Sequence, residues 1–250
     1  MIDVKNNRIK TFTALLISYT LLIALLCILS MAGVSGGIAV SAVYASAALF
    51  AVYFLKDSCR ECIDIEYPEE LREKTSVRCR ASDAGDRCKS RILICIKNYV
   101  RDNRRRKLFL SVAVLLVLIG VSFLITAVFG ASNIPVDKLT VNSNISFFVL
   151  LNVAVSAFRH VLVPAICEEF YFRRIVFLKL KKDCGVSFLL SAILSSLLFM
   201  DMHISGVDSM VFAFVSGFIL SFLIYVTDSV VYCCAVHFVY NLIAFAFIML

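Results

Sequence analysis

Charged residues are scarce in this sequence, and tryptophan is absent. Only 17% of the 250 residues are charged, whereas 61% are hydrophobic and the mean hydropathy is +0.91. This composition excludes an ordinary soluble domain and predicts an integral membrane protein. Because there is no Trp, any aromatic belt at the membrane surface has to consist of Tyr and Phe. Proline is also rare, with three residues, and neither an internal repeat nor a low-complexity tract is visible.

The first apolar run lacks the features of a cleaved signal peptide. It extends from Phe12 to about Ala32 behind a basic N-terminal tail, which is long for a signal-peptide core, and shows no clear small-x-small cleavage pattern. Leu26, which precedes Cys27, is too large for a lipoprotein cleavage site. We therefore expect this run to be retained as the first transmembrane helix.

Seven apolar stretches approach the length of about 20 residues that a membrane span needs. The sequence therefore predicts an all-α, polytopic transmembrane helical bundle of about seven helices, at 11–33, 38–55, 108–130, 146–172, 186–203, 209–226 and 229–249. We divide the chain into two N-terminal helices (1–55), a basic polar loop (56–107), a helix with an outer loop (108–145) and a C-terminal transmembrane core (146–250).

The basic residues fall in three regions of the chain. Of the 25 Lys and Arg residues, 23 lie in the N-terminal tail, in 56–107 or in 173–182. With the helix bounds above, all three regions lie on one side, so the positive-inside rule predicts a multi-pass plasma-membrane protein with a cytoplasmic N-terminus. The net charge of +7 then indicates a solvated loop whose stretches 91–97 and 104–107 can lie on anionic membrane lipids, with no nucleic-acid partner.

The ten cysteines do not indicate a disulfide framework. Six lie in or beside apolar stretches, where a thiol behaves as a small hydrophobic group: Cys27, Cys95, Cys167, Cys184, Cys233 and Cys234. The other four, Cys59, Cys62, Cys79 and Cys88, lie in the loop that we assign to the reducing cytosol. Their spacing lacks the second close pair of a zinc ribbon, so a structural zinc site there is the less favoured alternative.

Glu168 and Glu169 stand side by side in an otherwise apolar stretch. An ionised carboxylate in hydrocarbon costs roughly 2.5–3.5 kcal/mol even on insertion scales, so a partner or a water-filled cavity is expected nearby. Arg173 is four residues after Glu169, on the same helical face, and can pair with it. Glu168 points about 100° away and stays free. Pro164, four residues before Glu168, is expected to kink the helix.

Two of the three histidines follow in similarly apolar surroundings. Phe199 and His203 are four residues apart, as are His237 and Asn241, so each pair shares one helical face. Each signal alone has a structural interpretation: the Glu-Arg pair as a clamp, a histidine as a packing residue, and Asn241 as an interhelical hydrogen-bond anchor. Together they supply a carboxylate that can act as a general base, two imidazoles and an amide donor.

The depths of the two histidines constrain the bundle. Simple spans at the predicted bounds put His203 near the outer end of its helix and His237 about eight residues from the inner end of the last one. A shared site requires that the fifth helix starts further in, or that the sixth is short or re-entrant. Asp201 points some 200° away from His203 and is expected to face an aqueous edge.

These residues resemble the three motifs of the CPBP (or Abi) family of intramembrane proteases, which includes CAAX prenyl endopeptidases and bacterial proteins associated with bacteriocin processing or self-immunity. The motifs are Glu168-Glu169-x3-Arg173, Phe199-x3-His203 and His237-x3-Asn241. The resemblance covers about 150–245 and makes 146–250 the catalytic core. It implies an enzyme, an intramembrane endopeptidase that hydrolyses a bond in a peptide or membrane-protein substrate.

The resemblance also implies roles for the site residues. Glu168 would activate water as a general base, His203 and His237 would position that water or polarise the carbonyl, and Asn241 would donate to the oxyanion. Two His and one Glu form a recognised catalytic zinc set, so zinc held by Glu168, His203 and His237 and a metal-free, glutamate-activated water are both open.

By the same resemblance, Glu169 and Arg173 would hold the helix and set the charge balance of the site. Two functions of other classes remain as alternatives. One is a non-catalytic membrane scaffold, such as a bacteriocin-immunity or signalling protein, although the intact carboxylate and histidines argue against it. The other is a transporter that uses Glu168 and the histidines as a proton relay.

Overall fold

The protein is all-α in the part that the computed structural model describes, which comprises residues 2–33, 43, 46, 84–130, 147–203 and 205–249. Its elements are α1 (Ile2–Met31), α5 (Ala84–Arg101), α6 (Arg104–Phe129), α7 (Phe147–Ala157), η1 (Phe158–Leu162), α8 (Val163–Glu168), η2 (Glu169–Phe177), α9 (Leu178–Lys182), α10 (Phe188–Asp201), α11 (Val207–Thr227) and α12 (Val230–Met249). This confirms the predicted all-α bundle.

Four of the described helices are long and apolar enough to cross a membrane. They are Ile9–Leu29, Arg104–Phe129, Val207–Thr227 and Val230–Phe247, whereas Phe188–Asp201 is apolar but shorter. Together with the predicted motifs, these helices make the chain an integral membrane protein. The predicted span 38–55 lies outside the described residues, apart from Val43 and Ser46.

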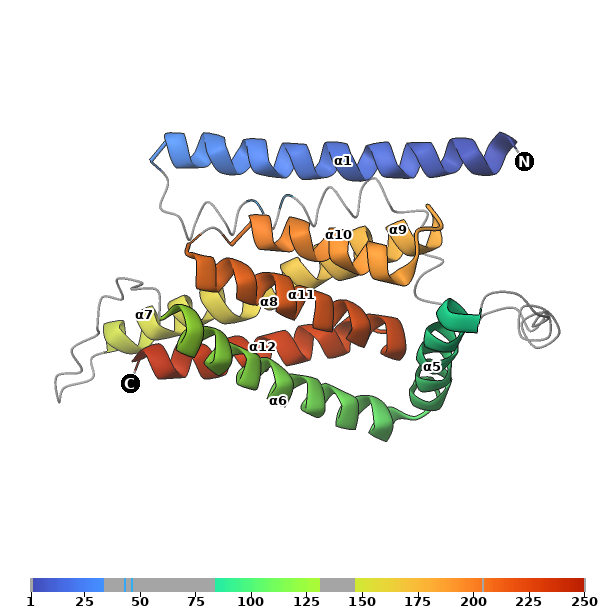
Figure 1. Ribbon diagram of the computed structural model, residues 1–250. Coiled ribbons are helices and arrows are strands. Elements are labelled where there is room, and N and C mark those ends of the chain that lie inside the picture. Colours follow the sequence, from blue (N-terminus) through green and yellow to red (C-terminus); the bar gives the residue numbers. More distant parts are fainter. Residues whose placement is uncertain are drawn as a thin grey trace.

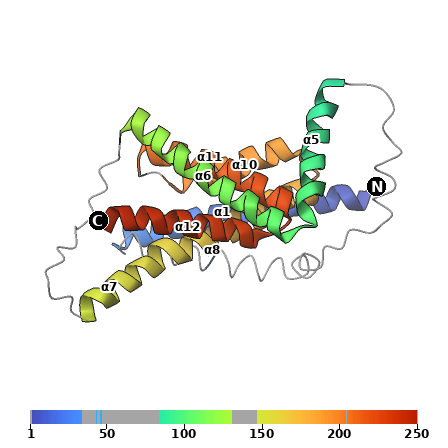
Figure 2. The ribbon, with the colours of Figure 1, turned by 90° about the horizontal axis from the view of Figure 1, so that it is seen from below.

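Most of the apolar helices run side by side, and α5 does not. Figure 1 shows α1, α6, α10, α11 and α12 extending along one common direction, and α5 standing across them at the end where the N-terminus lies. Figure 2, turned by 90°, shows the same crosswise α5. The basic helix α9 lies at this end too, so the described basic segments gather at one end of the bundle (Figure 1).

Two predicted boundaries at this end are wrong. The segment 56–107 is not all loop, because Ala84–Arg101 is the amphipathic helix α5. The helix predicted at 108–130 begins at Arg104, because Asn103 caps it: its side-chain oxygen accepts hydrogen bonds from the backbone N–H groups of Arg105, at 2.9 Å, and Arg106. Three arginines therefore form the first turn of a membrane-spanning helix.

The helix predicted at 146–172 continues to Lys182 and is not uniform. The elements α7, η1, α8, η2 and α9 follow one another without a break, and η1 and η2 are wound as π-helix. Pro164, in the first turn of α8 directly after η1, lacks the N–H that a regular α-helical bond to residue 160 would need. The second π-helical segment, η2, begins at Glu169. Glu168 therefore lies in the short α-helix between the two π-helical segments, and Glu169 is the first residue of the second.

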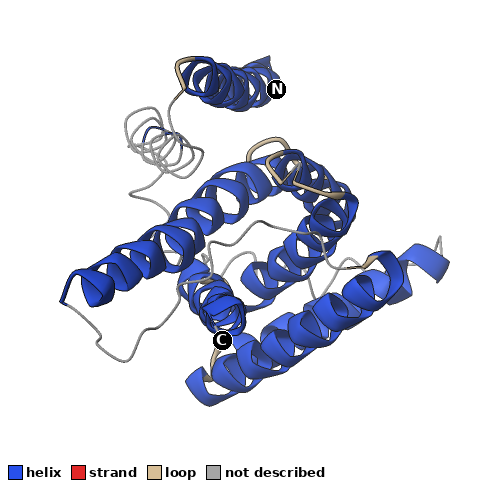
Figure 3. Cartoon of the chain, turned by 90° about the vertical axis from the view of Figure 1, so that its left-hand side faces the viewer, coloured by secondary structure: helices blue, strands red, loops and turns tan. Residues whose placement is uncertain are grey.

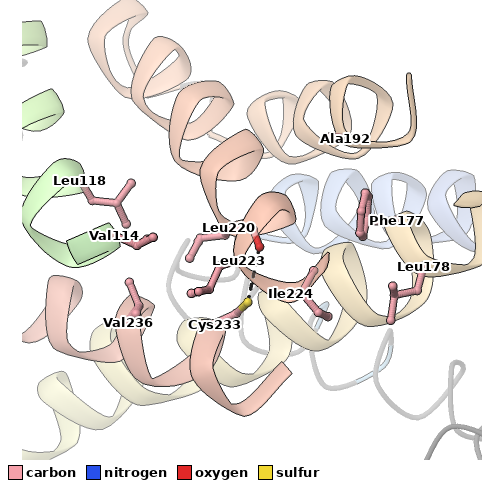
Figure 4. Close-up of a cluster of buried hydrophobic side chains, with 10 residues drawn as sticks. All are labelled: Val114, Leu118, Phe177, Leu178, Ala192, Leu220, Leu223, Ile224, Cys233 and Val236. Carbon is pink, nitrogen blue, oxygen red and sulfur yellow. Dashed lines mark hydrogen bonds between the residues drawn. The ribbon is translucent and has the colours of Figure 1, made fainter. Parts of the chain in front are cut away.

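The core is apolar and joins helices that are distant in sequence. Figure 4 shows one cluster in which Val114 and Leu118 of α6 meet Leu220, Leu223 and Ile224 of α11, with further members from η2, α9, α10 and α12. The Cys233 thiol donates to the Leu220 carbonyl oxygen at 3.5 Å within this cluster. Figure 3 shows α1 nearly end-on at the edge of the molecule, and Leu22 of α1 belongs to a second cluster with Tyr171 and Phe172 of η2.

Six cysteines of the described part are free thiols. Those described as free are Cys27, Cys95, Cys167, Cys184, Cys233 and Cys234. Cys59, Cys62 and Cys79 lie outside the described residues, and Cys88 lies in α5. The alternative of a structural zinc in the loop therefore stays a prediction.

Candidate active site

One oxygen of Glu168 faces both predicted histidines. Oε2 of Glu168 lies 4.0 Å from Nε2 of His203 and 3.8 Å from Nε2 of His237. The glutamate is 3% exposed, so the carboxylate is held inside the bundle next to two imidazoles. Residues from α8, from the segment just after α10 and from α12 thus converge on one point.

The lengths of the fifth and sixth helices bear on how the two histidines meet. α10 spans Phe188–Asp201, 14 residues, whereas α11 is a full span of 21 residues. The sixth helix is therefore not short, and the other alternative, a fifth helix that starts further in, stays a prediction, since α10 begins at Phe188, close to the predicted bound of 186. The ring of His203 also folds back over its own helix end, because Nδ1 bonds the Phe199 carbonyl oxygen at 2.8 Å.

Hydrogen bonds on the far side of each ring fix the tautomers. A carbonyl oxygen only accepts, so Nδ1 of His203 carries the proton that it donates to Phe199. Nδ1 of His237 lies 2.9 Å from Oε1 of Glu169, and an ionised carboxylate likewise only accepts. In their neutral forms both rings therefore present the lone pair of Nε2 towards Glu168.

Glu169 binds two cationic or donor groups at once. Its Oε2 lies 3.1 Å from Nε of Arg173, which is the predicted ion pair, and its Oε1 accepts from His237. The side chains of Glu169 and Arg173 are both 0% exposed. An isolated charge at this depth would be very costly, so each of the two residues needs the other.

Arg173 is neutralised by Glu169 and stacks on an aromatic ring. Its guanidinium carbon lies 4.2 Å from the centroid of the Phe199 ring, a cation–π contact. None of its three side-chain nitrogens has a well-directed hydrogen bond within the described residues, so the short Arg173–Glu169 distance is an ion pair of poor angular geometry. Phe199 also contacts the His203 ring, at a centroid distance of 4.4 Å.

Phe199 is kept in this place by close packing between α10 and α11. A Cβ on Gly217 would lie 3.2 Å from Cβ and Oγ of Ser196 and 3.3 Å from Cδ1 of Phe199. Glycine at this position therefore allows α11 to pack closely against Phe199. The ring of Phe199 contacts both Arg173 and His203. On α10, the Ser195 hydroxyl donates to the Phe172 carbonyl oxygen at 2.8 Å. This gives a hydrogen-bond partner to a backbone carbonyl of the π-helix η2.

Asn241 is the predicted site residue that the structure does not bring into this network. It follows His237 by one turn on α12 and is partly buried, and the described contacts of Glu168 and Glu169 do not include it. Its predicted role as an oxyanion donor stays a prediction.

Asp201 is exposed, as expected for a residue at an aqueous edge, but it also has a partner that sequence reasoning missed. Tyr19 of α1 donates to its Oδ2 at 2.7 Å. The neighbouring Ser18 is 3.0 Å from the hydroxyl of Tyr171. Polar residues at 18 and 19, inside an apolar span, were the only signal for this contact in the sequence. Helix α1 thus contacts two of the motif segments.

The three candidate ligands have donor chemistry that suits zinc, but their spacing is too wide for it. Ligand atoms about 2.05 Å from a tetrahedral zinc lie roughly 3.3 Å apart, whereas Nε2 of His203 and of His237 lie 4.0 and 3.8 Å from the Glu168 oxygen. Within the described residues no group of three His, Cys, Asp or Glu side chains is placed to hold a metal ion. A water molecule about 2.8 Å from each atom would fit the observed spacing.

Comparison with known families agrees with the motifs. Residues 150–243 match the family model described as "Type II CAAX prenyl endopeptidase Rce1-like". No curated protein and no solved structure matches the chain. The matched range contains both glutamates, Arg173, Phe199, the two histidines and Asn241. Residues 150–243 are therefore similar to an Rce1-like domain, consistent with the CPBP family, and this match supports intramembrane protease activity of the CAAX type in general.

Proposed function

We propose that this protein is an intramembrane endopeptidase in which Glu168 activates a water molecule for attack on a peptide bond of a peptide or membrane-protein substrate. The observation that carries the proposal is the convergence of two imidazole Nε2 atoms on Glu168 Oε2, at 3.8 and 4.0 Å. These distances leave room for one bridging water between the carboxylate and the rings.

The first step is general-base catalysis. Glu168 accepts a proton from the bridging water while the water oxygen attacks the scissile carbonyl carbon. The carboxylate is buried and its oxygen Oε2 has no hydrogen-bond partner in the described part of the protein, so its lone pairs are available to the water. Glu168 then returns the proton to the leaving amine.

The histidines orient the water and respond to the charge that develops. The water has two protons: one points to Glu168, and the other is donated to the Nε2 lone pair of one neutral ring, whose Nδ1 carries the ring proton. The other ring, when it is already an imidazolium before the attack, donates from Nε2 to the oxyanion of the tetrahedral intermediate. Asn241, one turn after His237, is the proposed amide donor to the same oxyanion.

Glu169 and Arg173 support this arrangement without touching the substrate. Glu169 fixes the tautomer of His237 through Nδ1, in the manner of carboxylates that orient histidines at catalytic centres. Arg173 balances the charge of Glu169 and fixes Phe199, whose carbonyl oxygen orients His203. Arg173 and Glu169 therefore act as positioning residues for both imidazoles.

The location that we propose is a plasma membrane, with the N-terminus in the cytoplasm. Four apolar helices support the membrane location, and the gathering of α5, α9 and the N-terminus at one end of the bundle supports the orientation (Figure 1).

The proposal is tested with detergent-purified protein and a library of quenched peptides. Wild-type protein is expected to cleave at least one peptide, Glu168→Ala to cleave none, and Asp183→Asn to retain activity. Asp183 is an exposed carboxylate paired with Lys179, so it controls for loss of a negative charge away from the site. Cleavage that persists in folded Glu168→Ala would refute the assignment.

A further inference from the structure

Helix α5 has two neighbouring faces, one packed against the bundle and one exposed. Towards the bundle, Val100 is 6% exposed and Lys97 forms an ion pair with Asp228, at 2.8 Å, next to the end of α11. On the adjacent face, Ile96 and Tyr99 are three residues apart, and Tyr99 is 61% exposed. The helix is thus tied to the protein along one side and carries exposed apolar groups along the next.

The exposed face of α5 continues into the apolar surface of a membrane span. The guanidinium of Arg106, in the first turn of α6, stacks on the Tyr99 ring at 3.8 Å from its centroid and donates to the Tyr99 carbonyl oxygen at 2.8 Å. Phe109, one turn later on the same face of α6, is 78% exposed on a helix apolar enough to span a membrane. An aromatic ring under an arginine, followed one helical turn later by an exposed phenylalanine, is typical of the membrane–water interface.

The charge at this end of the bundle is strongly positive. Arg104, Arg105 and Arg106 are all exposed. Nearby, the ammonium groups of Lys97 and Lys181 both lie over the ring of Tyr225, at 4.7 and 4.9 Å from its centroid. Burial, and then the charges of Lys97 and Lys182, lower the pKa of Lys181, and the opposing effect of Asp228 is smaller.

We propose that one surface of the protein docks on the headgroup region of an anionic phospholipid leaflet. This surface, here called the α5 surface, consists of Ile96 and Tyr99 of α5 and of Arg104–Arg106 in the first turn of α6. The crosswise orientation of α5 places it along the plane of the membrane when the spans cross it (Figures 1 and 2). Ile96 and Tyr99 enter the boundary between headgroups and acyl chains, and the three arginines pair with lipid phosphates. This binding site is independent of the proposed proteolysis.

The absence of tryptophan allows a direct test. Tyr99→Trp puts a single fluorophore on the α5 surface, and Phe123→Trp puts one on an exposed position of α6 far from the three arginines. Each full-length protein is reconstituted in nanodiscs that contain either brominated phosphatidylglycerol or brominated phosphatidylcholine at equal mole fraction. Trp fluorescence quenching then reports which lipid is in contact with each position.

The proposal predicts that phosphatidylglycerol quenches the fluorophore at position 99 at least about twofold more than phosphatidylcholine, since each basic residue near the surface favours anionic lipid severalfold. The fluorophore at position 123 should be quenched equally by both. The triple substitution Arg104→Gln, Arg105→Gln, Arg106→Gln should abolish the difference at position 99. Equal quenching by both lipids at position 99 would overturn the anionic preference, and no quenching would overturn membrane docking.

Discussion

Glu169 accepts a hydrogen bond from Nδ1 of His237 at 2.9 Å, across 68 positions of sequence. This contact joins the first motif, on η2, to the third, on α12. The same carboxylate pairs with Arg173, whose guanidinium lies on the ring of Phe199 in the second motif. A single buried carboxylate therefore links the three motifs and orients an imidazole towards its neighbour Glu168.

Glu169→Gln should destabilise the protein and inactivate it. The amide leaves the buried Arg173 charge uncompensated, which costs about 3–5 kcal/mol in comparable buried pairs. Thermal unfolding in detergent measures the loss of stability. The double variant Glu169→Gln, Arg173→Met removes both charges and should recover most of the stability while cleavage stays low, because His237 has still lost its carboxylate partner. An unchanged melting temperature for Glu169→Gln would show that the Glu169–Arg173 ion pair does not contribute to the stability of the protein.

Gly217→Ala should lower both stability and cleavage, whereas Gly120→Ala should not. The new Cβ at position 217 meets Ser196 and Phe199 at 3.2–3.3 Å, so α11 has to move away, at a cost of about 1–3 kcal/mol. Gly120, also helical, has nothing within 4 Å of a Cβ, and alanine there is expected to be neutral or stabilising by up to about 1 kcal/mol. Equal melting temperatures for the two variants would contradict the packing account.

Tyr19→Phe should weaken the docking of α1 on the second motif. It removes the hydrogen bond of 2.7 Å to Asp201 and leaves the ring in place. Because Asp201 is exposed, the coupling energy in a double-mutant cycle with Asp201→Asn should be modest, about 1 kcal/mol. Unfolding free energies of the four proteins of the cycle give this coupling. Strictly additive effects would show that the two side chains do not interact.

Removal of divalent metals should leave cleavage unchanged. The spacing of Glu168, His203 and His237 suits a bridging water better than a tetrahedral zinc. Dialysis of the purified protein against a strong chelator, followed by a cleavage assay and a measurement of bound metal, checks this expectation. Activity that is lost with the metal and restored by zinc would make these three residues ligands.

The sequence predicted which polar side chains lie together better than it predicted the paths of the helices that carry them. Costly polar residues in apolar stretches singled out Glu168, Glu169, Arg173 and the histidines, and helical spacing predicted the Glu169–Arg173 pair that the structure contains. Hydrophobicity alone also gave the all-α bundle. Both rest on local rules, namely the cost of charge in hydrocarbon and the geometry of one helical turn.

The features that were missed depend on contacts between distant segments. The approach of His203 to Glu168 depends on a ring that folds back onto Phe199, and hydropathy does not reveal this. The π-helical winding around the glutamates and the contact of Tyr19 with Asp201 likewise arise from packing. Helix α5 was missed because its composition is that of a polar loop, and only its amphipathic pattern distinguishes it.

The measurement that tests the central claim most directly is the cleavage rate of Glu168→Gln under single-turnover conditions, beside wild type, with a peptide that the wild type cleaves. Glutamine keeps the shape of the side chain but is a far weaker base. The account predicts a rate at least about 10²-fold lower, with an essentially unchanged melting temperature. A rate within a few-fold of wild type would mean that Glu168 is not the general base.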